Sequence, residues 1–193
     1  MKNRFLILVF IFSFVSITFI SFFDELKGNP VSEAAQFTYI GAEKCAGSCH
    51  KGDAKGRQYE IWQESNHSKA YFTLKTPKAD SIALSRGYTT PAVETPQCLK
   101  CHVLGKEIDP AELEPTFDIT QGIQCETCHG PGSEYKKLSI MKDREKAKEN
   151  GMIVYENNID EFCRKCHNSE SPSTKVYNFE EYWAKIQHPK PKE

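Results

Sequence analysis

The chain has 193 residues, the length of a single domain, and its 25 basic and 26 acidic residues leave a net charge of −1. No run of basic residues is suited to a nucleic acid, so the charge pattern excludes that class of partner. Hydrophobic residues make up 39% of the chain, and many of them lie in its first 23 residues. The rest is rich in Lys, Glu, Pro and Gly, and we expect it to bury a poor core by itself.

The N-terminal segment is predicted to direct the chain to a membrane. Lys2 and Arg4 precede residues 5–23, which are apolar apart from three serines and a threonine. At about 1.5 Å per residue, a helix of this length nearly spans a hydrocarbon layer of about 30 Å. We favour an anchor in the inner membrane over a signal peptide cleaved near Ala34, because the apolar run is long and that cleavage site comes late. In both cases residues 1–35 form the leader and tether, and residues 36–193 are exported to the periplasm.

Eight cysteines are the most unusual feature of the composition. Six of them form three C-x-x-C-H motifs, CLKCH at 98–102, CETCH at 125–129 and CRKCH at 163–167. This spacing is typical of covalent haem c, because two thiols add to the porphyrin vinyl groups and the next histidine is held beneath the iron. Zinc sites and disulfides are the alternatives. We favour haem, because a zinc site needs no histidine at this position and a bridge within C-x-x-C is strained.

The other two cysteines lie in CAGSCH at 45–50, which has one residue more between the cysteines. Both thiols and the following histidine are retained, and we expect Gly47 to let the longer loop fold back. We interpret this segment as a fourth haem site with a one-residue bulge; an unoccupied relic is the alternative. The predicted attachment sites are Cys45, Cys49, Cys98, Cys101, Cys125, Cys128, Cys163 and Cys166, and the predicted proximal iron ligands are His50, His102, His129 and His167.

Only two of the six histidines remain, so at most two of the four irons can have a second histidine ligand. His67 lies among aromatic residues at near-helical spacing, and His188 ends a predicted helix that Asn178 begins and Pro189 terminates. An aromatic stripe is usually core packing, and a terminal histidine is usually solvated. Here we expect both histidines to be distal ligands, because porphyrin takes the place of the core.

The expected fold is mainly α-helical with long coil. We predict helices near 56–75, 78–87, 109–115, 132–150, 158–165 and 178–188, and we find no convincing strand. The exported part offers roughly 40 residues for each haem, near the size below which a chain usually needs a cofactor to fold. The sequence therefore predicts a compact multihaem cytochrome c in which four stacked c-type haems replace the hydrophobic core.

The order of the motifs resembles a tetrahaem cytochrome c family of ammonia oxidisers, whose role is to accept electrons from hydroxylamine oxidoreductase. The residues that carry the resemblance, over about 38–188, are KCAGSCHKGDAKGRQYEIWQESNHSKAY, QCLKCHVLG, GIQCETCHGPGSEY, EFCRKCHNSESPS and YNFEEYWAKIQH. The resemblance implies that His67 faces His129 across the third iron. It also implies that His188 faces His167 across the fourth, and that the iron held by His102 has an open position.

The chain departs from this family at its first haem. The family has a regular first motif and a distal histidine shortly after the GPG turn, whereas GPGSEYKKLSIMKDREK contains no histidine. Tyr135 and Met141 are the nearby donors, and Met141 is our predicted ligand. Met152 is the other methionine outside the leader.

The predicted function is electron transfer between redox proteins, among them a hydroxylamine oxidoreductase-like enzyme or a quinone-linked cytochrome. All four proximal ligands are histidines, and nothing resembles a dedicated catalytic set. The alternative is an enzyme that reduces nitric oxide, hydroxylamine or nitrite at an open iron. A sensor or an assembling haem wire is a third interpretation, and neither a signalling domain nor a pairing motif supports it.

Overall fold

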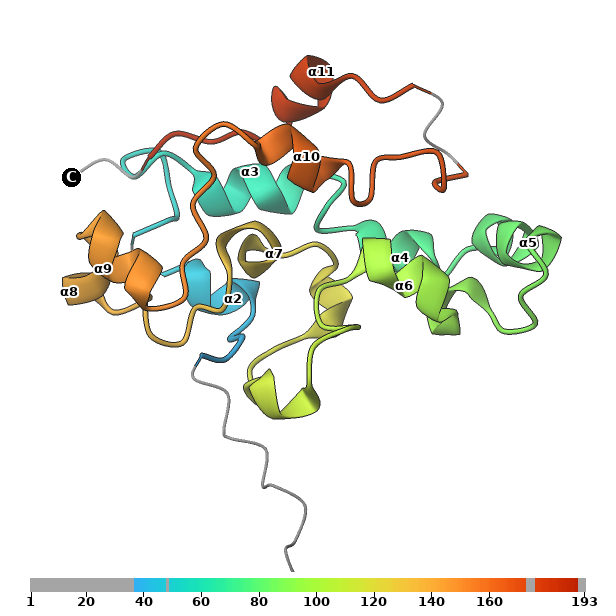
Figure 1. Ribbon diagram of the computed structural model, residues 1–193, viewed down its shortest axis with the longest axis horizontal. Coiled ribbons are helices and arrows are strands. Elements are labelled where there is room, and N and C mark those ends of the chain that lie inside the picture. Colours follow the sequence, from blue (N-terminus) through green and yellow to red (C-terminus); the bar gives the residue numbers. More distant parts are fainter. Residues whose placement is uncertain (1–36, 48, 173–175, 191–193) are drawn as a thin grey trace, which may run out of the picture. The chain divides into compact units, whose positions relative to one another are not determined.

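The computed structural model describes residues 37–47, 49–172 and 176–190, which belong to one compact unit, Gln36–Glu193 (Figure 1). The predicted membrane segment 5–23 and the cleavage site near Ala34 lie outside the described residues. Within those residues, no helix has both the length and the apolar character needed to cross a bilayer. Short helices and coil make up this unit, and one isolated parallel bridge joins Tyr39 to Leu113. The prediction of a mainly α fold with long coil is confirmed.

The helices of the first half carry the first two motifs and the segment between them. They are α2 (Ala42–Cys45), α3 (Gln58–Glu64), α4 (Ala70–Thr73), α5 (Pro77–Ser85), the 3₁₀ turn η2 (Ala92–Glu94) and α6 (Pro96–His102). CLKCH thus lies within α6, and Pro at its first position suits a helix start because proline needs no hydrogen-bond acceptor there.

The second half carries the other two motifs. Its elements are η3 (Pro110–Glu112), η4 (Ile119–Gln121), α7 (Cys125–His129), α8 (Leu138–Met141), α9 (Arg144–Glu149), α10 (Ile159–Cys163) and α11 (Phe179–Trp183). CETCH coincides with α7, while CRKCH begins at the last residue of α10. Helix α2 packs against α7, and α4 packs against α6 and η4 (Figure 1).

All six predicted helices are shorter in the structure than the sequence suggested, and the range 109–115 contains only the 3₁₀ turn η3. The range 56–75 is interrupted at Ser65, whose backbone is extended and whose hydroxyl donates to the Trp62 carbonyl at 2.7 Å. The range 132–150 is interrupted at Asp143, which caps α9 by accepting from the Lys146 amide. Helix α11 ends at Trp183, so His188 lies beyond it and not at its tip.

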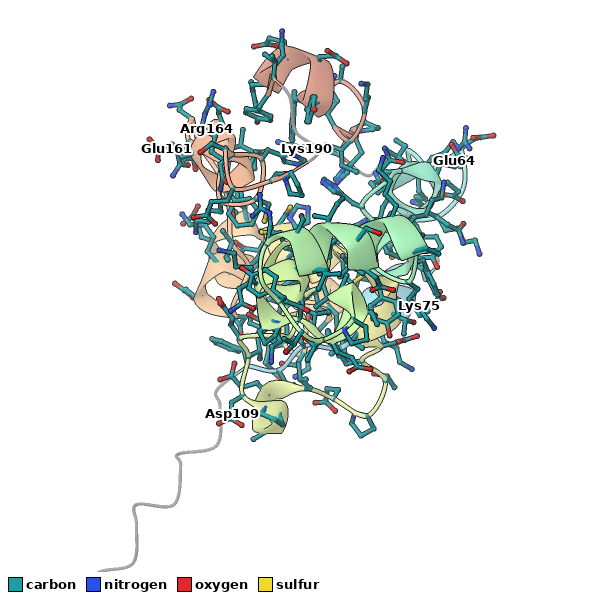
Figure 2. The ribbon with its side chains drawn as sticks, turned by 90° about the vertical axis from the view of Figure 1, so that its right-hand side faces the viewer. Glu64, Lys75, Asp109, Glu161, Arg164 and Lys190 are labelled. Atoms are coloured by element: carbon teal, nitrogen blue, oxygen red, sulfur yellow. The ribbon has the colours of Figure 1, made fainter. Side chains whose placement is uncertain are left out.

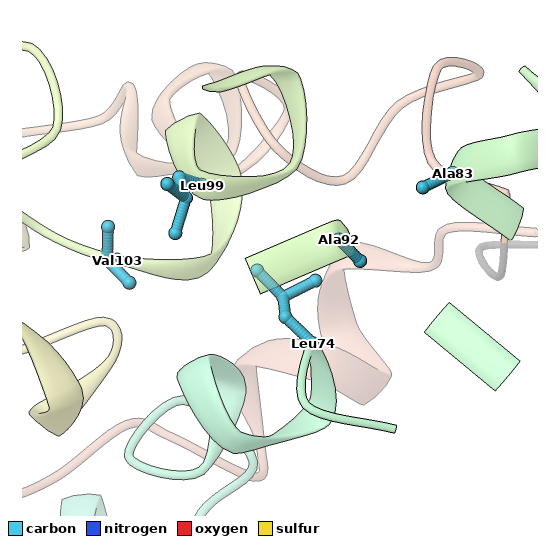
Figure 3. Close-up of a cluster of buried hydrophobic side chains, with 5 residues drawn as sticks. All are labelled: Leu74, Ala83, Ala92, Leu99 and Val103. Atoms are coloured by element: carbon cyan, nitrogen blue, oxygen red, sulfur yellow. The ribbon is translucent and has the colours of Figure 1, made fainter. Parts of the chain in front are cut away.

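The apolar core is small. One cluster lies among α4, α5, η2 and α6, and the other joins α2 to α3. Three of the four largest fully buried side chains in the described part of the chain are polar. In Figure 2 the labelled side chains of Glu64, Asp109 and Glu161 lie at the edge of the molecule, and Figure 3 shows the larger cluster. The clusters consist of Leu74, Ala83, Ala92, Leu99 and Val103, and of Ala42, Ala46, Tyr59 and Trp62.

Candidate haem centres

A cavity of about 2580 Å³ runs through the unit, several times the ~300–1,000 Å³ of a pocket for one small ligand. All eight cysteines and all six histidines line it. These are the predicted attachment sites Cys45, Cys49, Cys98, Cys101, Cys125, Cys128, Cys163 and Cys166, together with His50, His67, His102, His129, His167 and His188. The structure therefore brings every predicted covalent and axial residue to one continuous space, although they come from the whole length of the described chain.

Contacts between thiols give the order of the motifs around this space. Contact with Cys125 raises the pKa of Cys45, and contact with Cys45 lowers the pKa of Cys125. Burial and then the neighbouring Cys163 raise the pKa of Cys128 to about 12. Burial, followed by contact with Cys101, raises the pKa of Cys166 to about 12. The first motif thus adjoins the third, the third adjoins the fourth, and the fourth adjoins the second.

Two pairs of imidazole rings face each other across the cavity. The ring centres of His67 and His167 are 6.1 Å apart, and those of His129 and His188 are 5.9 Å apart. Metal–imidazole bonds of about 2.0–2.1 Å place the centres of two rings on opposite sides of one metal about 6 Å apart. Both spacings fit a metal between the rings. The structure brings His67 next to His167 and His188 next to His129, the reverse of the pairing that the resemblance implied, with the ring planes tilted by 42° and 43°.

His67 lies in the turn between α3 and α4. The Ile123 amide donates to its carbonyl at 3.0 Å, and Trp62 Nε1 donates to the Ile123 carbonyl at 2.7 Å. Gly122 has φ of +70°, and a Cβ there would lie 2.5 Å from the His67 carbonyl oxygen, so this close approach requires glycine. Burial and then His167 lower the pKa of His67 to about 4, so its ring is neutral near pH 7 and can bind a metal.

His102 is held by helix α4. Its Nδ1 lies 2.9 Å from the Ala70 carbonyl oxygen and 3.1 Å from Thr73 Oγ1, and the Thr73 hydroxyl donates to the same carbonyl at 2.6 Å. A carbonyl accepts only from a protonated nitrogen, so Nδ1 carries the proton and Nε2 is left to bind a metal. Such an outer partner fixes the ring and raises its basicity.

The first motif is held less regularly. Helix α2 ends at Cys45, and Ser48 lies outside the described residues. Gly47 has no left-handed φ, and a side chain added there would meet open space, so the expected need for glycine is not supported. The His50 carbonyl accepts from the Tyr59 amide at 2.9 Å. Burial, then His188, lowers the pKa of His50.

The two candidate donors for the first iron differ in the structure. The Tyr135 hydroxyl is already used, because it donates to the Gly130 carbonyl at 2.9 Å, and burial raises its pKa further above the ordinary value. Met141 is the last residue of α8 and lines the cavity, and Met152 also lines the cavity. Met141 therefore stays our predicted ligand.

Glu126, inside CETCH, is a site residue that sequence reasoning missed. It is 1% exposed, and its carboxylate accepts from the amides of Gly132 at 2.7 Å, Gly41 at 2.8 Å and Ile40 at 3.0 and 3.1 Å. Burial raises its pKa, but all three partners are donors, so they favour the ionised carboxylate. Glu126 thereby ties the third motif to the chain before α2. The C-x-x-C-H pattern assigns no role to the residues between its cysteines, so it contained no signal for this one.

Positive charge gathers around the cavity although the whole chain is nearly balanced. Ten basic residues and three acidic residues line it. Glu156 and Glu170 already pair with Arg144 at 2.6 Å and Lys100 at 2.8 Å. An excess of cations suits a group with carboxylates, such as the propionates of haem. The basic residues are Lys44, Lys55, Lys78, Arg86, Lys100, Lys136, Lys142, Arg144, Lys165 and Lys190.

The arrangement suits haem and does not suit a directly coordinated ion. Within the described ranges, no three side chains of His, Cys, Asp or Glu converge as they would around one metal ion. The thiols are instead distributed in pairs around a large space, each pair followed by an imidazole. The residues present therefore fit several covalent haems.

A chain that surrounds such a space with paired thiols, each pair followed by an imidazole, has the features of a c-type cytochrome, and its repeated motifs fit several haems. Residues 44–130 match the family described as cytochrome c554 and c-prime, which confirms the resemblance over the first three motifs. The chain is 33% identical to cytochrome c-554 of Nitrosomonas europaea over 109 residues, 54% of this chain and 43% of that protein. It thus spans less than half the length of this relative. No solved structure matches the chain.

Proposed function

We propose that this chain is a periplasmic electron-transfer protein with four covalent haem c groups, one at each motif. The observation that supports the proposal most strongly is the cavity lined by every cysteine and histidine, with two imidazole pairs about 6 Å apart across it. Each haem, when bound, supplies an iron that gains and loses one electron without covalent bond changes.

The chain's own residues support a carrier more than an enzyme. The paired imidazoles near the third and fourth motifs would hold a haem iron from both sides if haem is bound there, and a doubly ligated iron favours electron transfer over substrate binding. Ala70 holds His102 in one tautomer through its carbonyl, and the Gly122 turn holds His67. Rigidly held ligands keep the geometry of an iron site similar in its two oxidation states, which favours electron transfer.

The proposed partners are redox proteins that donate and accept electrons, including a hydroxylamine oxidoreductase-like enzyme or a quinone-linked cytochrome. Similarity to cytochrome c-554 supports this choice. We further propose that residues 5–23 either anchor the protein to the inner membrane or are removed by cleavage near Ala34. The apolar run after Lys2 and Arg4 supports export.

The number of haems and the function can be tested on one sample of the exported protein. We expect its mass to exceed that of the polypeptide by four haems, because the chain has four attachment motifs. We also expect a reductive titration to take up four electrons. A mass increase of only three haems would mean that the irregular first motif carries no haem. The same measurement tells whether the leader is cleaved.

A reductase of a small nitrogen compound is the second candidate, and one observation favours it. Six histidines supply four proximal ligands and at most two distal ones, so at least two of the four irons would lack a second histidine. Nitric oxide or hydroxylamine is therefore added to the reduced protein in the presence of an electron donor. Sustained consumption would favour the reductase, whereas a spectral shift without turnover favours the carrier.

The ligand pairing can be tested by replacing each distal histidine. We expect His67→Ala and His188→Ala each to convert one low-spin iron to high spin. In the reduced protein, where bis-histidine irons are low spin and diamagnetic, nuclear Overhauser effects should connect the His67 ring with the haem attached at Cys163 and Cys166. Contacts between that ring and the haem at Cys125 and Cys128 would contradict the pairing seen in the structure.

A further inference from the structure

The segment that carries His188 has little helical support. Helix α11 ends at Trp183, and the last backbone hydrogen bond of the turn after it runs from the Gln187 amide to the Trp183 carbonyl at 2.8 Å. His188 itself is exposed and lies in coil. Something other than α11 must hold the imidazole opposite His129.

The C-terminal segment is held by the turn that precedes α3. Gln58, the first residue of α3, is 7% exposed, and its Nε2 donates to the Pro189 carbonyl and to the Lys55 carbonyl, both at 2.9 Å. This is a long-range bond, 131 residues apart in sequence. It fixes Pro189, the residue next to His188, against the buried side-chain amide of Gln58.

Gly56 makes that approach possible. Its φ is +104°, and a Cβ at this position would lie 2.9 Å from Pro189 Cγ and 2.9 Å from Gln58 Nε2. Any larger residue would both strain the backbone and push Pro189 away. Gly56 and Gln58 together therefore form a fitted contact surface for Pro189, which we call the Pro189 contact.

The two distal histidines are held in different ways. His67 is partly buried in a turn whose carbonyl accepts from Ile123 and lies against Gly122. His188 is exposed, and the next residue in the chain connects it to the rest of the unit through the Pro189 contact. A ligand on a loosely held segment loses more conformational freedom when it binds, so one good anchor affects its binding strongly.

We propose that the Pro189 contact positions His188 as a distal iron ligand, and that the iron it binds is where an outside ligand can displace a histidine. Gln58 and Gly56 are thus positioning residues, which act through the polypeptide and not by touching the iron. This inference rests on the proposed function, because it needs His188 to be an iron ligand.

The test uses the haem-loaded protein and compares Gln58→Ala with Gln63→Ala. Gln63 lies on the same helix and its side chain is exposed, so it is a matched control. Gln58→Met removes the hydrogen-bond donor but keeps most of the side-chain volume. It therefore tests the same hydrogen bond if Gln58→Ala folds poorly. His188→Ala defines complete loss of the ligand.

Three measurements are made on each variant: the high-spin fraction of the ferric protein, the carbon monoxide affinity of the ferrous protein, and hydrogen exchange of the segment 176–190. Outer-shell partners typically change metal affinity by about 10–100-fold. For Gln58→Ala and Gln58→Met we expect the apparent carbon monoxide affinity of one haem to rise at least about tenfold, because carbon monoxide competes with His188 for the iron. We also expect faster hydrogen exchange in the segment 176–190. Gln63→Ala should match the unmodified protein.

The outcomes separate this inference from the assignment of the ligand. If Gln58→Ala and Gln58→Met behave like Gln63→Ala while His188→Ala becomes high spin, His188 is a ligand but the Pro189 contact does not position it. If His188→Ala leaves every spectrum unchanged, the ligand assignment in the proposed function fails first. A high-spin gain in the Gln58 variants that is smaller than that of His188→Ala and absent from Gln63→Ala supports the proposal.

Discussion

A chain produced without haem is expected to be largely unfolded, and so is a variant with Cys125 and Cys128 both replaced by alanine. The two apolar clusters are small, and the cavity of about 2580 Å³ that separates the elements gives them little else to pack against. A domain that buries so little apolar surface cannot offset its loss of conformational entropy. Far-UV circular dichroism and hydrogen exchange would measure the loss of structure.

The matched control for this prediction is the second motif. Cys98→Ala with Cys101→Ala should be less damaging, because Leu99 in that motif belongs to the larger apolar cluster (Figure 3). The third motif instead contacts the first through Cys45 and is tied to the N-terminal part of the unit by Glu126. A compact haem-free chain with a sharp unfolding transition would contradict the claim that haem supplies the core.

Glu126→Ala is expected to destabilise the haem-loaded protein by about 3–5 kcal/mol, because it leaves three buried backbone amides without their acceptor. For a chain of this size the apparent Tm should fall by roughly 10 °C. Glu126→Gln should lose less, since its carbonyl oxygen still accepts while its amide group faces donors. Thermal unfolding followed at the haem absorbance band would measure both variants.

Glu64→Ala is the control for Glu126. Glu64 is also a glutamate in a short helix, but it is exposed and pairs with Arg57 at 3.1 Å on the surface. Surface ion pairs contribute about 0–1 kcal/mol, so this change should be nearly neutral. Equal losses for the Glu126 and Glu64 variants would show that the buried carboxylate does not hold the third motif in place.

The helical boundaries illustrate what local pattern misses. The near-helical spacing of aromatic residues around His67 predicted one helix over 56–75, but Ser65 interrupts it. The interruption lets the His67 carbonyl accept from Ile123, a residue far along the chain. A hydrogen bond of this kind depends on two segments that meet in space, and no pattern within either segment predicts it.

The sequence determines the chemistry of the candidate haem sites, whereas the tertiary structure determines how their residues are positioned. The haem-attachment motifs, the mainly α fold and the poor core follow from the sequence itself, because thiol and imidazole must lie within a few residues to act on one porphyrin. Which histidines face each other, and why Glu126, Gln58 and Gly122 matter, was decided only by the tertiary structure. Those features depend on contacts between segments far apart in the chain, and no motif within one segment predicts them.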